Sequence, residues 1–131
     1  MSTAVLDQPL SRAAQPSASA RAATRAFLAR AARLRAPAEV GSIDAVLLVV
    51  SELVTNAVRH TDGPCTLRLK LLDHSIDVRV TDRSPQHPQP RTPSTQGTGG
   101  WGWPLIKRLA THIRIKPMPE GGKTISAELP W

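Results

Sequence analysis

The sequence predicts an α+β fold, a two-layer sandwich in which a mixed, mainly antiparallel sheet is covered on one face by helices. Two observations predict this class. Segments of helical period and segments of alternating apolar residues are segregated along the chain, in the order helix, helix, strand pair, long loop, helix, strand pair. The strand-like segments come as adjacent pairs separated by short turns, which favours antiparallel hairpins over an alternating parallel fold.

The beginning of the chain is predicted to be an arm outside the domain. Residues 1–18 are small and polar and show no apolar period, which predicts disorder, so a single domain is expected over residues 19–131. An alanine- and arginine-rich helix is expected from about Ser19 to Arg35, where Pro37 prevents its continuation.

The second helix and the first hairpin follow in order. Ile43 to His60 carries an apolar stripe of helical period, with Ser42 as the expected N-cap, and it ends before the turn residues 61–64. Apolar residues then alternate with polar ones over residues 65–71 and 76–80, which predicts two strands joined by a short turn.

The last third of the chain predicts a loop, a helix and a second hairpin. Residues 83–96 hold four prolines and no apolar period, which is typical of a long functional loop. A glycine cluster at residues 97–102 precedes a helix expected from Pro104 to about Thr111, because proline is favoured at the first helical position. Strands are expected over residues 113–116 and 123–129.

The positive charge of the chain is concentrated at its beginning. The formal net charge is +7, but residues 1–35 hold six arginines against one acid, whereas the rest holds 11 basic and 9 acidic residues. Aromatic side chains, on which bases stack, make up 3% of the chain. These features make nucleic-acid binding a minority hypothesis for this chain.

No apolar run approaches the ~18 to 20 residues needed to span a bilayer, so no membrane-spanning segment is expected. A single cysteine, Cys65, can form neither an internal disulfide nor a structural zinc site. We therefore expect a cytoplasmic protein.

Two polar residues on the second helix are candidates for chemistry. Glu52 and Asn56 are one turn apart and lie roughly opposite the apolar stripe. They fit an ordinary solvated face, but the helix is apolar nearly all round in its first half, which indicates that this side is covered. A carboxylate and an amide on a covered face can supply a general base and an Mg²⁺ ligand. Both interpretations stay open on spacing alone.

Asp82 is predicted to point into the core. Ile76, Val78 and Val80 alternate on the inward face of their strand, and Asp82 has the same parity. A buried carboxylate needs a donor. It is either a strand-end cap of the following turn or the partner of a ligand amino group such as that of adenine.

Residues 97–102 match the pattern GxGxxG in front of a helix, where backbone N–H groups can bind phosphate. The pattern alone is weak. A dinucleotide-binding unit requires a strand before the glycines, and a protein-kinase glycine loop requires further motifs downstream; neither is present. A flexible linker is the alternative.

The segment Ser51–His60, SELVTNAVRH, strongly resembles the N box of the GHKL ATPases, the superfamily of DNA gyrase and sensor histidine kinases. The residues of this segment are most similar to those of the anti-sigma-factor serine kinases and of the small actinobacterial ATP-binding regulators related to them. The region of Asp82 corresponds to the G1 box, residues 97–106 to the G2 box, and the closing residues 121–130 to the terminal strand. The resemblance covers about residues 20–131.

This resemblance implies a role for each matching residue. Glu52 is implied as the general base, Asn56 as the Mg²⁺ ligand and Asp82 as the adenine anchor. Gly99, Gly100 and Gly102 are implied as the phosphate-binding glycines. Thr124 is implied as a residue that assists at adenine. Strand parity does not independently support an inward Thr124.

The resemblance implies ATP and Mg²⁺ as cofactors and, as partners, a sigma factor and an anti-anti-sigma protein that is phosphorylated on serine; a homodimer is left open. The chain departs from the family pattern at Arg83-Ser84-Pro85, where DxGxG is usual, and at Trp103-Pro104, where leucine is usual. These departures leave two regulatory hypotheses besides the nucleic-acid one: an anti-sigma serine kinase and a non-catalytic ATP-binding regulator.

Overall fold

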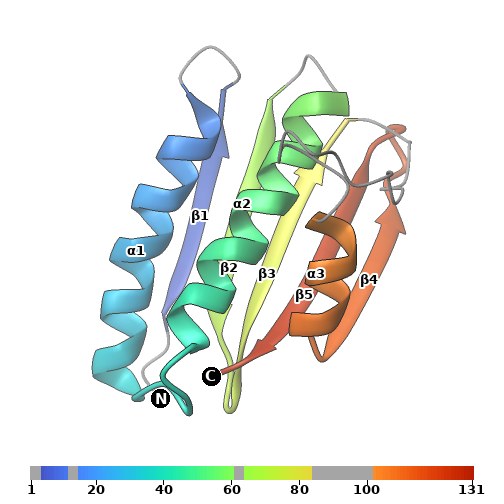
Figure 1. Cartoon of the computed structure of the whole chain (residues 1–131). Helices are drawn as coiled ribbons and strands as arrows, with labels where there is room; N and C mark the ends of the chain where they lie inside the picture. Colours follow the sequence, from blue (N-terminus) through green and yellow to red (C-terminus); the bar gives the residue numbers. More distant parts are fainter. Residues whose placement is uncertain (1–3, 12–14, 61–63, 84–101) are drawn as a thin grey trace, which may run out of the picture.

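The structure, a computed structural model, describes residues 4–11, 15–60, 64–83 and 102–131. Its elements are β1 (Val5–Leu10), α1 (Pro16–Leu34), α2 (Ser42–His60), β2 (Cys65–Leu71), β3 (Ser75–Asp82), α3 (Gly102–Leu109), β4 (His112–Pro117) and β5 (Lys123–Pro130). The five-stranded sheet has the order β1-β2-β3-β5-β4, and every neighbouring pair is antiparallel. The helices lie over one face of this sheet (Figure 1), which confirms the predicted α+β two-layer class.

The two faces of the sheet differ because successive side chains of a strand point to opposite sides. Val78 on β3 is fully buried beneath the helices and lies opposite Ala127 of β5, whereas the next residue, Arg79, is exposed. The helices close the buried face with side chains that are at most 1% exposed: Phe27, Leu28, Val46, Val50, Leu53 and Val54. The core therefore lies between the helices and the inner face of the sheet.

The expectation of a disordered arm over residues 1–18 is wrong for the described residues of that segment, 4–11 and 15–18. Val5–Leu10 forms β1, an edge strand paired with β2 from Val5 opposite Lys70 to Leu10 opposite Cys65. Proline at position 9 is tolerated because an edge strand leaves one row of backbone groups without a ladder partner. The segment is too short and polar to predict from its own residues, and its pairing partner, β2, lies about sixty residues further along the chain.

The remaining elements lie close to their predicted positions. The helix of Ile43–His60 is found from Ser42, and the last helix begins two residues earlier than expected, at Gly102. The first helix begins at Pro16 instead of Ser19, directly after Gln15, whose φ of 51° places it in the left-handed region. Within the described parts of the chain, no helix has both the length and the apolar character that crossing a membrane requires.

Trp131 connects the last strand to the α1–α2 connection. Its side chain is 3% exposed, and its indole Nε1 donates a hydrogen bond to the backbone oxygen of Arg35 at 2.9 Å. Its backbone accepts a hydrogen bond from the N–H of Ala38 at 3.1 Å and donates one to the oxygen of His74 at 3.0 Å. The residue thus fixes α1, α2 and the β2–β3 turn at one end of the sheet.

At the opposite end of the sheet, three element ends lie together. These are the C-terminal end of α2, the end of β3 and the start of β5, whereas α3 begins nearer the middle of the sheet (Figure 1). Residues 84–101, which include most of the predicted proline-rich loop and most of the glycine cluster, lie outside the described residues.

Candidate nucleotide-binding site

Glu52 and Asn56 lie one turn apart in the second half of α2, on the same side of the helix. Leu53 and Ala57, each one residue further on, are at most 1% exposed and pack into the core, whereas Glu52 and Asn56 are half-buried. α2 also contacts α3, and the intermediate exposure of Glu52 and Asn56 shows that their side of the helix is not fully solvated. This side of α2 is thus partly covered, and the roles expected of Glu52 and Asn56 stay predictions.

Asn56 carries an unsatisfied buried atom. Its side-chain oxygen Oδ1 is buried and has no hydrogen-bond partner among the described residues. Leaving a buried acceptor unpaired costs about 1 to 3 kcal/mol, so native structures rarely do so without a reason. An amide oxygen is a ligand type that Mg²⁺ accepts, and this orphaned oxygen therefore fits a metal or a ligand donor.

One other buried side-chain atom of the described chain lacks a partner, Arg35 Nε at the end of α1. It is part of the connection held by Trp131, at the other end of the sheet, and has no relation to Asn56. Among the described residues, no three His, Cys, Asp or Glu side chains gather into a metal cluster. Mg²⁺ is usually held by one or two protein ligands together with waters and substrate phosphates, and a single amide oxygen such as that of Asn56 suits such a site.

Asp82 lies where strand parity predicted, on the inner face at the end of β3, and its side chain is 1% exposed. It is not an unpaired acceptor. The ammonium Nζ of Lys123 donates to both carboxylate oxygens, at 3.0 Å to Oδ1 and 2.9 Å to Oδ2. Lys123 is also 1% exposed, so the two charges form a buried ion pair.

The register of β3 and β5 creates this pair. Lys123 is the first residue of β5 and lies directly opposite Asp82, the last residue of β3. Lys123 shares its parity with Ile125, Ala127 and Leu129, all of which point into the core. Sequence reasoning missed this lysine, although its parity on the predicted strand gave the signal.

The turn before β5 presses against the end of β3. Gly121 has a φ of 103°, a backbone conformation that side chains disfavour, and Gly122 is buried. A Cβ on Gly122 would overlap the backbone oxygen of Asp82. The two glycines therefore allow the close approach that places Lys123 beside Asp82.

Thr124 lies on the other face of β5 from Lys123, so its side-chain contacts lend no support to the expected role at adenine. It follows Lys123 by one residue and so points to the open face of the sheet. Its Oγ1 lies 2.9 Å from Oγ1 of Thr81 and 3.4 Å from the sulfur of Met118. This agrees with the strand parity, and a role of Thr124 at adenine stays a prediction from the resemblance.

The thiol of Cys65 is affected by the charge of Asp82. Burial first, and then the negative charge of Asp82, raise the pKa of the Cys65 thiol above its ordinary value of 9.0. The thiol is therefore neutral at physiological pH, and Lys123 remains the charged neighbour that the structure shows on the carboxylate.

The predicted phosphate-binding glycines are described only at their end. Gly102 is the first residue of α3. Gly99 and Gly100 lie outside the described residues. Of the residues that depart from the family pattern, Arg83 is exposed and Trp103 is half-buried against the core.

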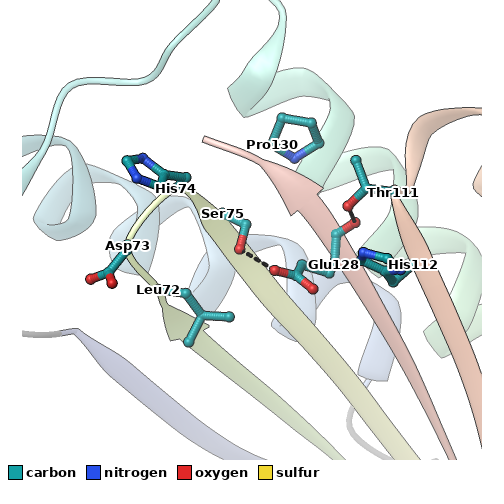
Figure 2. A pocket seen from close by; sticks show the side chains of 8 residues that line it. All are labelled: Leu72, Asp73, His74, Ser75, Thr111, His112, Glu128 and Pro130. Atoms are coloured by element: carbon teal, nitrogen blue, oxygen red, sulfur yellow. Dashed lines mark hydrogen bonds between the residues drawn. The ribbon is translucent and has the colours of Figure 1, made fainter.

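A separate pocket at the other end of the sheet contains none of the predicted site residues (Figure 2). His74, Ser75, His112 and Glu128 are among the residues that line it, and the Ser75 hydroxyl donates to Oε1 of Glu128 at 2.6 Å. Because Ser75 begins β3 and Asp82 ends it, this pocket and the candidate site are separated by the length of the strand.

The chain matches the family model of the histidine kinase-like ATPase domain over residues 13–128. No curated protein matches the chain in a sequence search. The family match spans nearly all of the described elements, from α1 to β5, and the observed sheet with helices on one face agrees with it. The chain belongs to the histidine kinase-like ATPase domain family, ATP-binding domains of the GHKL superfamily that the α2 motif resembles.

Proposed function

We propose that this protein is an ATP-dependent regulator that transfers the γ-phosphate of Mg²⁺-bound ATP to a serine of a partner protein, as anti-sigma-factor serine kinases do. The observation that carries the proposal is the orphaned, buried Oδ1 of Asn56, which needs a partner that the described residues do not supply. The family match supports ATP as the ligand. By resemblance, the partners are a sigma factor and an anti-anti-sigma protein.

In this proposal Asn56 holds Mg²⁺ through Oδ1. Bound Mg²⁺–ATP supplies the phosphoryl group, and the metal offsets the negative charge of the phosphates. Glu52, one turn earlier on the same side of α2, is half-buried, so its carboxylate is accessible to an incoming protein substrate. Glu52 would take the proton of the serine hydroxyl as that oxygen bonds to the γ-phosphorus, while the bond from this phosphorus to the β–γ bridging oxygen breaks and ADP leaves.

Two further elements bind the nucleotide in this proposal. Asp82 accepts a hydrogen bond from the adenine amino group at the end of β3, and the backbone N–H groups near Gly102 bind phosphate where α3 begins. Gly99 and Gly100 are assigned to the same phosphate contact from the resemblance alone.

A non-catalytic ATP-binding regulator is the second candidate, and one observation favours it. The carboxylate of Asp82 already holds the ammonium of Lys123 through both oxygens, which weakens base recognition. The nucleic-acid hypothesis gains no comparable support, because two of the four aromatic residues, Phe27 and Trp131, are buried and thus removed from stacking.

Transfer of radiolabelled phosphate from ATP to purified anti-anti-sigma proteins separates the two candidates. Glu52→Ala should keep ATP affinity within a few-fold and lower transfer by about 10²- to 10⁴-fold, the usual contribution of a general base. Ser126→Ala, on the open face of β5, is the control that should leave both unchanged. If a cognate partner binds tightly and ATP binds normally, yet no phosphate is transferred, the kinase assignment fails and the non-catalytic regulator replaces it.

A further inference from the structure

The buried pair of Asp82 and Lys123 bears directly on base recognition. The lysine nitrogen is equally close to both carboxylate oxygens, at 3.0 and 2.9 Å, and both side chains are 1% exposed. Any donor group of a bound base must therefore share or displace an ammonium that already lies on both oxygens.

The two possible partners of Asp82 differ in strength. An ammonium and a carboxylate attract each other as full charges, and this attraction is strong where water is excluded. An exocyclic amino group of a base is neutral and makes a single hydrogen bond, which is a weaker interaction with the same carboxylate. The lysine therefore has the advantage over the base.

We infer that Lys123 is an intramolecular competitor of the nucleotide base for Asp82 and thereby determines how tightly, and how selectively, this protein binds ATP. The inference rests on the proposed function, because it assigns base recognition to Asp82. It extends that function by naming a residue which lowers affinity for adenine and which the family resemblance does not assign.

Lys123 also changes what the site can distinguish. A carboxylate alone accepts from the amino group of adenine and repels the carbonyl oxygen at the same position of guanine. An ammonium beside it donates to that carbonyl oxygen. With Lys123 in place the site thus loses part of its preference for adenine over guanine, and without Lys123 the preference increases.

The test is calorimetric titration of Mg²⁺–ATP into the full-length protein and its Lys123→Met variant. Methionine keeps the length of the side chain and removes its charge. ATP affinity should increase by about 10- to 100-fold, the amount that one hydrogen bond to a charged group supplies. Without nucleotide the variant should melt at a lower temperature than the wild type, and ATP should raise its melting temperature by more.

Three comparisons show whether the gain comes from Asp82. Purine riboside triphosphate, which lacks the amino group, should bind both proteins alike. The control Lys116→Met, at an exposed lysine of β4, should leave ATP affinity unchanged. In the double variant Asp82→Asn/Lys123→Met, the gain for ATP should be lost.

If Lys123→Met binds ATP no more tightly than a wild type that does bind Mg²⁺–ATP, the competitor role is wrong and the proposed function stands. If neither protein binds Mg²⁺–ATP, the proposed function fails and this inference fails with it. Should the variant not fold, the ¹⁵N resonance of the Lys123 ammonium is followed in the wild type. Saturating Mg²⁺–ATP should release it into fast exchange with water, and an unchanged resonance at saturation contradicts the inference.

Discussion

Lys123 and Asp82 lie directly opposite each other on β5 and β3, and the lysine ammonium contacts both carboxylate oxygens in a site where each side chain is 1% exposed. Bringing two charges out of water is unfavourable unless they stay together. The pair therefore connects the stability of the fold to the availability of Asp82 for a ligand.

Removing one member of this pair should destabilise the protein more than removing both. Asp82→Ala or Lys123→Met alone should lower the free energy of unfolding by about 3 to 5 kcal/mol, because a buried charge is left uncompensated. The double variant Asp82→Leu/Lys123→Met should be much closer to the wild type. Urea denaturation followed by circular dichroism measures all three.

A partly exposed pair on the same strand provides the control. Asp77 and Arg79 form an ion pair at 2.7 Å in which the arginine side chain is 51% and the aspartate side chain 15% exposed. Asp77→Ala should change stability by only about 0 to 1 kcal/mol, as is usual for surface pairs. Equal losses at Asp77 and Asp82 would show that the Asp82 pair is not buried.

Gly122→Ala should destabilise the end of β3. The new Cβ would overlap the backbone oxygen of Asp82, so the turn must shift, at a cost of about 1 to 3 kcal/mol. Gly41→Ala is the matched control, because a Cβ at Gly41 meets nothing within 4 Å. Thermal unfolding should separate the two variants, and equal melting temperatures contradict the close contact.

The raised pKa of Cys65 predicts a loss of stability at alkaline pH. The unfolded chain ionises this thiol near its ordinary value of 9.0, whereas the folded protein keeps it protonated to higher pH. The folded state then binds more protons, so its stability falls as pH rises above 9 by up to about 1.4 kcal/mol per pH unit from this group. The contribution of this thiol is isolated by measuring the free energy of unfolding of the wild type and of Cys65→Ala from pH 7 to 10. The wild type should lose more stability over this range than the variant. If stability falls equally with pH in both proteins, the pKa of Cys65 is not raised.

Trp131 should be important for stability although it is far from the candidate site. Trp131→Ala removes a buried ring and the hydrogen bond to Arg35, and should cost about 3 to 5 kcal/mol. Trp131→Phe keeps most of the ring and should lose only about 1 kcal/mol, the value of a typical hydrogen bond. Urea midpoints measure the difference; if the phenylalanine variant is as unstable as the alanine one, the ring does not provide the stabilisation.

The parts of the fold that the sequence predicts best are those whose signal is local. The α2 helix carries its apolar stripe within its own residues, and strand alternation in β3 is enough to place Asp82 on the inner face. The same alternation places Thr124 on the opposite face of β5 and, applied to Lys123, would have found the lysine.

What the sequence does not predict depends on contacts between distant segments. β1 is a strand because β2, far along the chain, offers it an edge. The Asp82–Lys123 pair joins residues 41 positions apart, and only the register of β3 and β5 shows that they are opposite each other. No local pattern contains that register, because side chains packed between the helices and the sheet determine it.

Mg²⁺-dependent nucleotide binding through Asn56 is the central claim, and titration calorimetry with a non-hydrolysable ATP analogue, with and without Mg²⁺, measures it most directly. The wild type and the control Ser126→Ala should bind the analogue more tightly with Mg²⁺. In Asn56→Ala the gain from Mg²⁺ should fall by about tenfold or more, since even an outer-shell partner of a metal site contributes 10- to 100-fold. No heat and no thermal shift at millimolar nucleotide, or an Asn56→Ala variant with the full effect of Mg²⁺, would contradict the account.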